Sequence, residues 1–302
     1  MNEESLTSQE LNELKELETE SRLANKINFK ELGVLYYFIL YLATYWGLIA
    51  IYHTFGDLHL LINWYTAKGI FLYIFYLIPG FTPVFCAIIV LAFTEGKVGL
   101  IQWLKRLVRF KFKFYWYLIP IFLPIIAYII PISIYVLTGN ASLNPFTDTA
   151  FWSIENSYIL GTALTLFMEE PGVRGYATSK MNEKRHPLVT GATVGFIWAI
   201  WHLPNYYYGA RPWYTFPQFV FTVIIISCIY TWMFIHTDSI IPGMLFHFMH
   251  NICNSLYIQV GLPIYGGLTY LVMLGIILLI FGLKLQRPIK NVEENNQVIN
   301  PE

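Results

Sequence analysis

Long apolar runs recur along the chain and are separated by short polar segments. A helix needs about 20 apolar residues to cross a hydrocarbon core of about 30 Å, and the runs have about this length. We therefore predict an all-α fold, a polytopic transmembrane helical bundle of about eight helices. The predicted spans are about 33–54, 69–94, 114–138, 153–178, 188–208, 215–235, 239–258 and 263–283.

Polar segments flank the apolar region at both ends. Residues 1–32 are predicted to form a polar N-terminal tail and residues 286–302 a polar C-terminal tail. One membrane domain, 33–285, lies between them. The first residues lack the basic start and apolar stretch of a signal peptide, so we expect this N-terminus to be retained.

Composition agrees with a membrane setting. Charged residues make up 13% of the chain and hydrophobic residues 56%, whereas soluble domains carry about 25% charged residues. The abundance of Ile, Tyr, Asn and Lys favours a bacterial source, and hence a bacterial cell membrane. We expect the lipid bilayer as a partner and no nucleic acid, and the sequence predicts no particular oligomeric state.

The distribution of basic residues predicts the orientation of the bundle. With eight spans, 17 of the 19 Lys and Arg residues fall on the side of both termini, and only Lys68 and Arg211 fall toward the other. Lys and Arg gather on the cytoplasmic side of membrane proteins. Both termini are therefore predicted to be cytoplasmic.

Ionisable side chains inside apolar spans are costly, by about 2.5–3.5 kcal/mol at a helix centre, so each one suggests a function. Three of the predicted spans contain such groups, together with an amide. These residues are Glu169, Glu170 and Arg174 in span four, His202 in span five, and His247, His250 and Asn251 in span seven.

Spacing separates the two glutamates. Residues four apart share a helix face, so Glu170 is predicted to pair with Arg174. Glu169 is left without an obvious partner, which suits a general base. His247 and Asn251 are also four apart, and together they offer hydrogen-bond donors to a developing oxyanion.

Depth within the membrane allows these groups to cooperate. At about 1.5 Å rise per residue, Glu169, His247, Asn251 and His202 lie roughly 12 to 21 Å from the cytoplasmic ends of their spans. This agreement requires span four to continue past Pro171 to about residue 178.

Three motifs in order resemble those of one protease family. The string EEPGVRGY resembles the EExxxR motif of the CPBP family, which comprises the CAAX proteases and bacteriocin-processing enzymes and includes the type II CAAX prenyl endopeptidase. Trp198 and His202 fit the family's aromatic-xxx-His motif, with Trp in place of the usual Phe. His247 and Asn251 fit its His-xxx-Asn motif. The resemblance covers about residues 150–257 and implies an eight-helix core.

The resemblance implies an intramembrane endopeptidase of glutamic type that cleaves a membrane-associated peptide or protein. Glu169 would activate water with the assistance of His202, and His247 with Asn251 would stabilise the oxyanion. Supporting roles would fall to Glu170, Arg174 and Trp198. His250 has no motif position, and we expect it to be a supporting or packing residue.

A zinc-dependent variant of this chemistry is the main alternative for the site. Glu and His side chains bind zinc with an open position in catalytic sites, and here the ligands would be Glu169, His202 and His247. The sequence lacks the HExxH spacing of zinc peptidases. We therefore expect no cofactor, and zinc if a metal is used.

Two other function classes use the same residues. The chain could be a bacteriocin-immunity protein or membrane scaffold in which catalysis is secondary, and a pure scaffold would tolerate Glu169→Ala. It could also be a transporter with a Glu/His/Arg proton relay. Transporters, however, often show inverted repeats and paired broken helices, which this sequence does not show.

Overall fold

The computed structural model describes residues 32–54, 78–138, 156–209, 211–259 and 266–281. In these residues the regular elements are all helices and no strand is present. The all-α fold class is therefore confirmed. The predicted tails lie outside the described residues, apart from residue 32.

Each predicted span contains a helix. The longest agree closely with the apolar runs, although the part of span two before residue 78 lies outside the described residues. The helices in the spans are α2 (Gly33–Thr54), α4 (Thr82–Thr94), α6 (Tyr115–Leu137), α8 (Asn156–Gly172), α10 (Pro187–Trp201), α12 (Phe216–Thr237), α13 (Ile241–Gln259) and α14 (Gly266–Phe281). The short elements are η2 (Ile78–Phe81), α9 (Ser179–Asn182), α11 (Leu203–Tyr207) and η4 (Trp213–Thr215).

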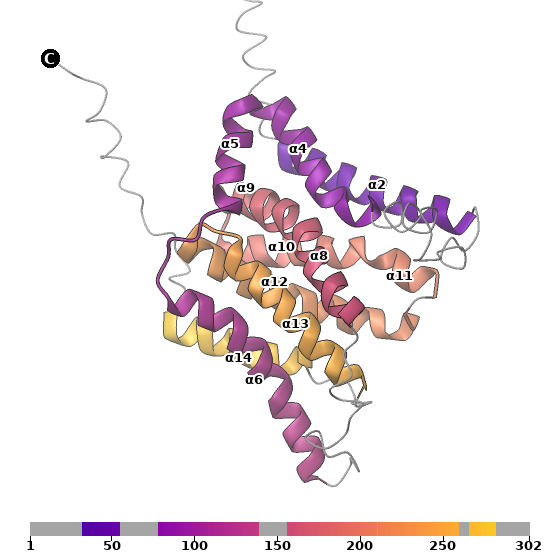
Figure 1. Cartoon of the computed structure of the whole chain (residues 1–302), viewed down its shortest axis with the longest axis vertical. Helices are drawn as coiled ribbons and strands as arrows, with labels where there is room; N and C mark the ends of the chain where they lie inside the picture. Colours follow the sequence, from indigo (N-terminus) through magenta and orange to yellow (C-terminus); the bar gives the residue numbers. More distant parts are fainter. Residues whose placement is uncertain (1–31, 55–77, 139–155, 210, 260–265, 282–302) are drawn as a thin grey trace, which may run out of the picture.

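The helices form three tiers (Figure 1). Helices α2 and α4 lie along one edge of the bundle, and α6 and α14 lie along the opposite edge. Helices α8, α10, α12 and α13 lie between them, with α10 packed against α12, α8 against α4 and α13, and α13 against α6. The middle tier therefore carries all three motifs and packs against the helices of both edges.

Several of these helices suit a bilayer by length and composition. Three stretches of the described residues are long and apolar enough to cross a membrane: Gly33–Thr54, Tyr115–Ile134 and Trp213–Thr237. Shorter apolar helices lie at Ile78–Thr94, Pro187–Trp201 and Leu268–Leu279. The bundle is thus typical of a helical membrane fold.

One helix was not predicted. Helix α5 (Gly96–Leu107) occupies part of the basic segment between spans two and three. Basic residues flank its apolar stretch, residues 98–104, which is much shorter than the about 20 residues of a membrane span and therefore does not mark a span in the sequence. Figure 1 shows α5 running across one end of the bundle, at the end where α9 lies and opposite α11.

Helix α8 continues through Pro171, as the site required. A proline removes one N–H and crowds the carbonyl four residues earlier, which often breaks a helix. Here α8 ends at Gly172 and leads directly into a π-helical turn, η3 (Val173–Thr178), and then into α9. The indole Nε1 of Trp103 donates to the Pro171 carbonyl at 2.9 Å. Wide turns of this kind within helices are frequent at functional sites.

Span five is interrupted, which the single span 188–208 did not anticipate. Helix α10 ends at Trp201 and α11 begins at Leu203, with His202 between them. The His202 N–H bonds the Ala199 carbonyl three residues back at 3.0 Å, the tight spacing of a 3-10 turn. Pro204 has no N–H to extend α10, so the chain turns at His202.

Glycines allow the middle tier to pack closely. A Cβ on Gly172 would lie 2.2 Å from the Pro83 carbonyl oxygen of α4, and one on Gly191 would lie 2.6 Å from the Cys228 Cα of α12. Small residues at helix contacts let backbones approach in this way in membrane proteins.

Candidate active site

Four charged or ionisable side chains are buried together in the middle tier. The exposed fractions are 7% for Glu169, 0% for Glu170, 1% for Arg174 and 5% for His247. They come from α8, η3 and α13, and α8 packs against both of the other elements. Burying charged groups is costly unless they are paired, so their partners define the site.

Glu170 links two elements. Its Oε2 lies 3.4 Å from Arg174 Nε, the ion pair that the four-residue spacing predicts. Its Oε1 lies 2.9 Å from His247 Nδ1. The second contact joins α8 to α13 and was not predicted, since the motifs lie far apart in sequence. Glu170 therefore fixes the side chain of His247 as well as compensating Arg174.

Arg174 sits in a corner formed by two aromatic rings. Its guanidinium carbon lies 4.5 Å from the Trp198 ring centroid and 4.2 Å from that of Tyr230. The two rings are inclined at 71° to each other, and Arg174 Nη1 donates to Ser227 Oγ at 3.3 Å. Cation–π contacts in desolvated places contribute about 2 kcal/mol or more. The rings therefore help to hold this buried charge.

Tyr230 and Ser227 were missed by the sequence analysis. Both lie on α12, which carries none of the three motifs. The signal was present, because the two residues are three apart and share a face of an otherwise apolar span.

Glu169 has a partner that spacing within span four did not reveal. Trp198 Nε1 donates to Glu169 Oε2 at 2.7 Å, and both side chains are buried. The expectation of an unpartnered Glu169 is therefore corrected. The second oxygen, Oε1, has no hydrogen-bond partner among the described residues.

Trp198 contacts all three motifs. Besides Glu169 and Arg174, its ring lies edge-on to the rings of His247 and His202, with centroids 5.5 and 5.7 Å apart. Its carbonyl oxygen lies 2.9 Å from His202 Nδ1. The position that carries Trp in place of the family's usual Phe is thus at the centre of the site.

His202 is half-buried at the break between α10 and α11. A carbonyl oxygen can only accept a hydrogen bond, so His202 Nδ1 donates to the Trp198 carbonyl. In the neutral ring, Nε2 then has a free lone pair. The ring is held edge-on by Trp201 and Phe219, with centroids 4.6 and 5.1 Å away.

The side chains of the residues predicted on span seven point in two different directions. His247 contacts Glu170, and Asn251, which is half-buried, follows one turn later on α13. His250 instead faces α6 and α14, where its Nδ1 lies 3.0 Å from Tyr270 Oη and 3.4 Å from Tyr128 Oη. The geometry therefore separates His250 from the charged cluster.

The described residues do not fit the zinc alternative. Within them, no group of three or more His, Cys, Asp or Glu side chains is arranged to hold a metal ion.

The arrangement suits acid–base chemistry on a polar bond. It combines a carboxylate oxygen without a hydrogen-bond partner in the described structure, a histidine held in one tautomer, and a second histidine anchored through a carboxylate. Such groups can move protons and stabilise a developing negative charge.

Comparison with known proteins agrees with the three motifs. Residues 152–253 match the model of one family, described as type II CAAX prenyl endopeptidase Rce1-like. No curated protein matches the chain as a relative. The matched segment includes the EExxxR, Trp-xxx-His and His-xxx-Asn residues. Residues 152–253 are therefore similar to the type II CAAX prenyl endopeptidase Rce1-like family, which agrees with the resemblance to the CPBP family.

Proposed function

We propose that this protein is an intramembrane endopeptidase of glutamic type that hydrolyses a peptide bond in a membrane-associated protein or peptide. The family match of residues 152–253 supports a CAAX-type protease in general. The assignment of the chemistry to individual residues rests on the contacts within the buried cluster.

Glu169 is the general base of the proposed reaction. Trp198 engages Oε2 and thereby orients the carboxylate. Oε1, which has no hydrogen-bond partner among the described residues, accepts a proton from the attacking water. The water oxygen bonds to the scissile carbonyl carbon, and the carbonyl oxygen becomes the oxyanion. General bases placed in this way contribute about 10²- to 10⁴-fold to rate.

His202 exchanges protons in the proposed reaction, and His247 stabilises the oxyanion. The carbonyl oxygen of Trp198 keeps the proton of His202 on Nδ1, so Nε2 is free to exchange protons with the water and the leaving amine. With His247 Nδ1 held by Glu170, a proton on Nε2 makes the ring an oxyanion donor beside Asn251. When the C–N bond breaks, the proton taken by Glu169 passes to the amine nitrogen.

The observation that carries this proposal is the pairing within the cluster. Of the two adjacent buried carboxylates, Glu170 is bound by both Arg174 and His247, whereas Glu169 is bound through one oxygen only. Glu170 therefore acts as the structural carboxylate and Glu169 as the reactive one. Two neighbouring acids with different surroundings commonly divide their roles in this way.

The test compares membrane peptides from cells that carry wild-type protein, Glu169→Ala or Glu183→Ala. Glu183 is a half-exposed surface carboxylate paired with Lys180 at 3.4 Å, so it serves as the matched control. We expect specific precursors to accumulate in Glu169→Ala cells and not in Glu183→Ala cells. Identical peptide profiles for all three proteins, at equal protein levels, would contradict a peptidase role and favour a scaffold.

A further inference from the structure

Helix α5 has one face on the protein and one face free of it. Trp103 is 4% exposed and donates to the Pro171 carbonyl, so the inner face is fixed to α8. The outer face presents Val98, Ile101 and Leu104 at 66%, 41% and 51% exposure. A soluble surface rarely leaves so many aliphatic side chains together, which marks this face as an interaction surface.

Basic residues surround these aliphatic side chains. Between Gly96 and Phe114 the sequence contains six Lys and Arg residues and no Asp or Glu. Arg106 and Arg109 are engaged by Asp238, at 3.3 and 2.9 Å. The other four cations are exposed and have no ion-pair partner among the described residues. They are Lys97, Lys105, Lys111 and Lys113.

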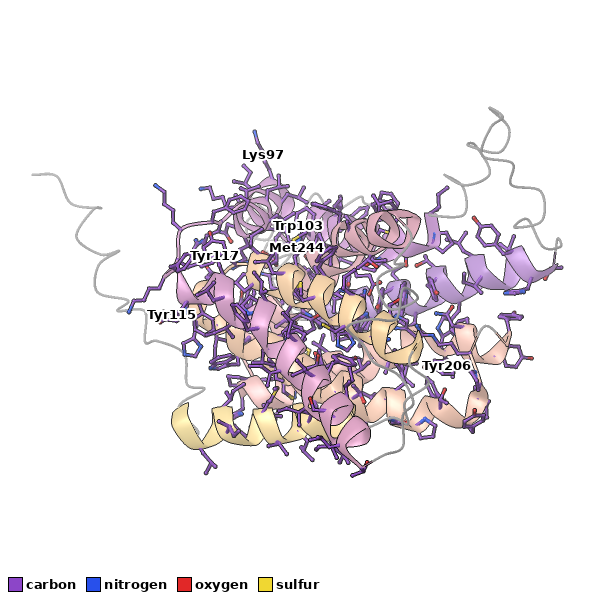
Figure 2. All side chains as sticks on the ribbon, turned by 60° about the horizontal axis from the view of Figure 1, so that its bottom comes forward. Lys97, Trp103, Tyr115, Tyr117, Tyr206 and Met244 are labelled. Carbon is purple, nitrogen blue, oxygen red and sulfur yellow. The ribbon has the colours of Figure 1, made fainter. Side chains whose placement is uncertain are left out.

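The location of α5 at one end of the bundle suits contact with the membrane–water interface. The helix runs across the end of the bundle, and Lys97 extends outward from the ribbon (Figures 1 and 2). Aromatic side chains are also exposed at the helix ends before and after this segment, at Phe93 on α4 and Tyr115 on α6. Aromatic residues of this kind gather at the membrane–water interface. The segment that contains α5 is therefore flanked by exposed aromatic side chains at both ends.

We propose that residues 96–114 form a docking surface for anionic phospholipid headgroups. The aliphatic side chains of α5 enter the boundary of the acyl chains, and the lysine stems follow them while the ammonium groups reach the phosphates. An amphipathic helix with a basic polar face lies in the interface in this manner. The cation excess of the segment makes anionic lipid the matching partner.

A probe on the outer face tests this directly in the full chain. A Val98→Cys variant is labelled with an environment-sensitive fluorophore, since the three native cysteines are buried. The protein is reconstituted in phosphatidylcholine vesicles that contain increasing amounts of phosphatidylglycerol. We expect the emission to shift to the blue as phosphatidylglycerol increases. The shift should weaken in high salt, because the Debye length, over which charges attract each other, falls to about 3 Å at 1 M.

Charge-removal variants give the control. Each lysine near an anionic surface contributes about fivefold to lipid affinity, so Lys97→Gln with Lys105→Gln should require severalfold more phosphatidylglycerol for the same shift. Arg211→Gln removes an exposed cation that the charge distribution places toward the opposite side, and it should leave the shift unchanged. The same emission with and without phosphatidylglycerol, or equal behaviour of the double lysine variant and Arg211→Gln, would overturn the proposal. This readout does not depend on proteolysis, so its failure is distinct from failure of the proposed function.

Discussion

Replacing Trp198 with Phe isolates the hydrogen bond that orients Glu169. The substitution removes the indole N–H, which lies 2.7 Å from Glu169 Oε2, and keeps an aromatic ring beside Arg174 and His247. It also installs the residue that the family usually has at this position. The test therefore asks whether this particular chain depends on its tryptophan.

The size of the effect follows from the charge on the acceptor. A hydrogen bond to a charged group contributes about 1.5–3 kcal/mol. If the carboxylate must be reoriented at that cost in each turnover, kcat falls by about 10- to 150-fold, at about 1.36 kcal/mol per tenfold change in rate. KM should change little, because the bond to Glu169 forms within the enzyme and not with substrate.

The assay is cleavage of a precursor that accumulates in Glu169→Ala cells, measured with purified protein in proteoliposomes. Trp201→Phe is the matched control, because Trp201 is a buried indole on the same helix that donates to Thr82 Oγ1 at 3.4 Å. It should retain most of the wild-type kcat. A Trp198→Phe variant with kcat equal to that of Trp201→Phe would refute the positioning role of the indole.

Three other predictions concern the buried cluster and its packing. Arg174→Met should lower the free energy of unfolding by about 3–5 kcal/mol, because it leaves Glu170 buried without its cation. Thermal unfolding in detergent measures this loss of stability. An unchanged unfolding midpoint would contradict the prediction. Gly172→Ala should cost about 1–3 kcal/mol through overpacking against the Pro83 carbonyl, whereas Gly161→Ala, with no atom within 4 Å of the new Cβ, should not destabilise the protein. Chelators should leave proteolysis unchanged, and loss of activity that zinc alone restores would show that the site binds metal after all.

Much of the fold could be predicted because each long apolar run has only one favourable structure in lipid. Helices satisfy their own backbone hydrogen bonds, so runs such as 33–54 and 215–235 specify spans by composition alone. The continuation through Pro171 was a requirement of the site, and the π-helical turn after it provides that continuation. The break at His202 was missed, although Pro204 two residues later carried the signal.

Helix α5 was not predicted, because its buried face is set by contacts with distant parts of the chain. Its apolar stretch, residues 98–104, is short and lies between basic residues, so it does not stand out as a membrane span. Its inner face is defined by contacts such as that between Trp103 and Pro171, which join segments far apart in the chain.

The same limit applied to the site. Spacing within one helix correctly paired Glu170 with Arg174, since both lie on one face. The contacts of Glu170 with His247 and of Glu169 with Trp198 cross between helices. No intrahelical spacing encodes such contacts, and family motifs indicate which residues matter without indicating which atoms meet.

The central claim is that Glu169 is the base that activates water. Glu169→Gln tests it most directly, because an amide oxygen can still accept the Trp198 N–H while the amide cannot take a proton from water. With purified protein in proteoliposomes, we predict that kcat falls by about 100-fold or more, with the thermal midpoint and substrate affinity retained. Cleavage by Glu169→Gln at a rate close to that of wild type would contradict the account.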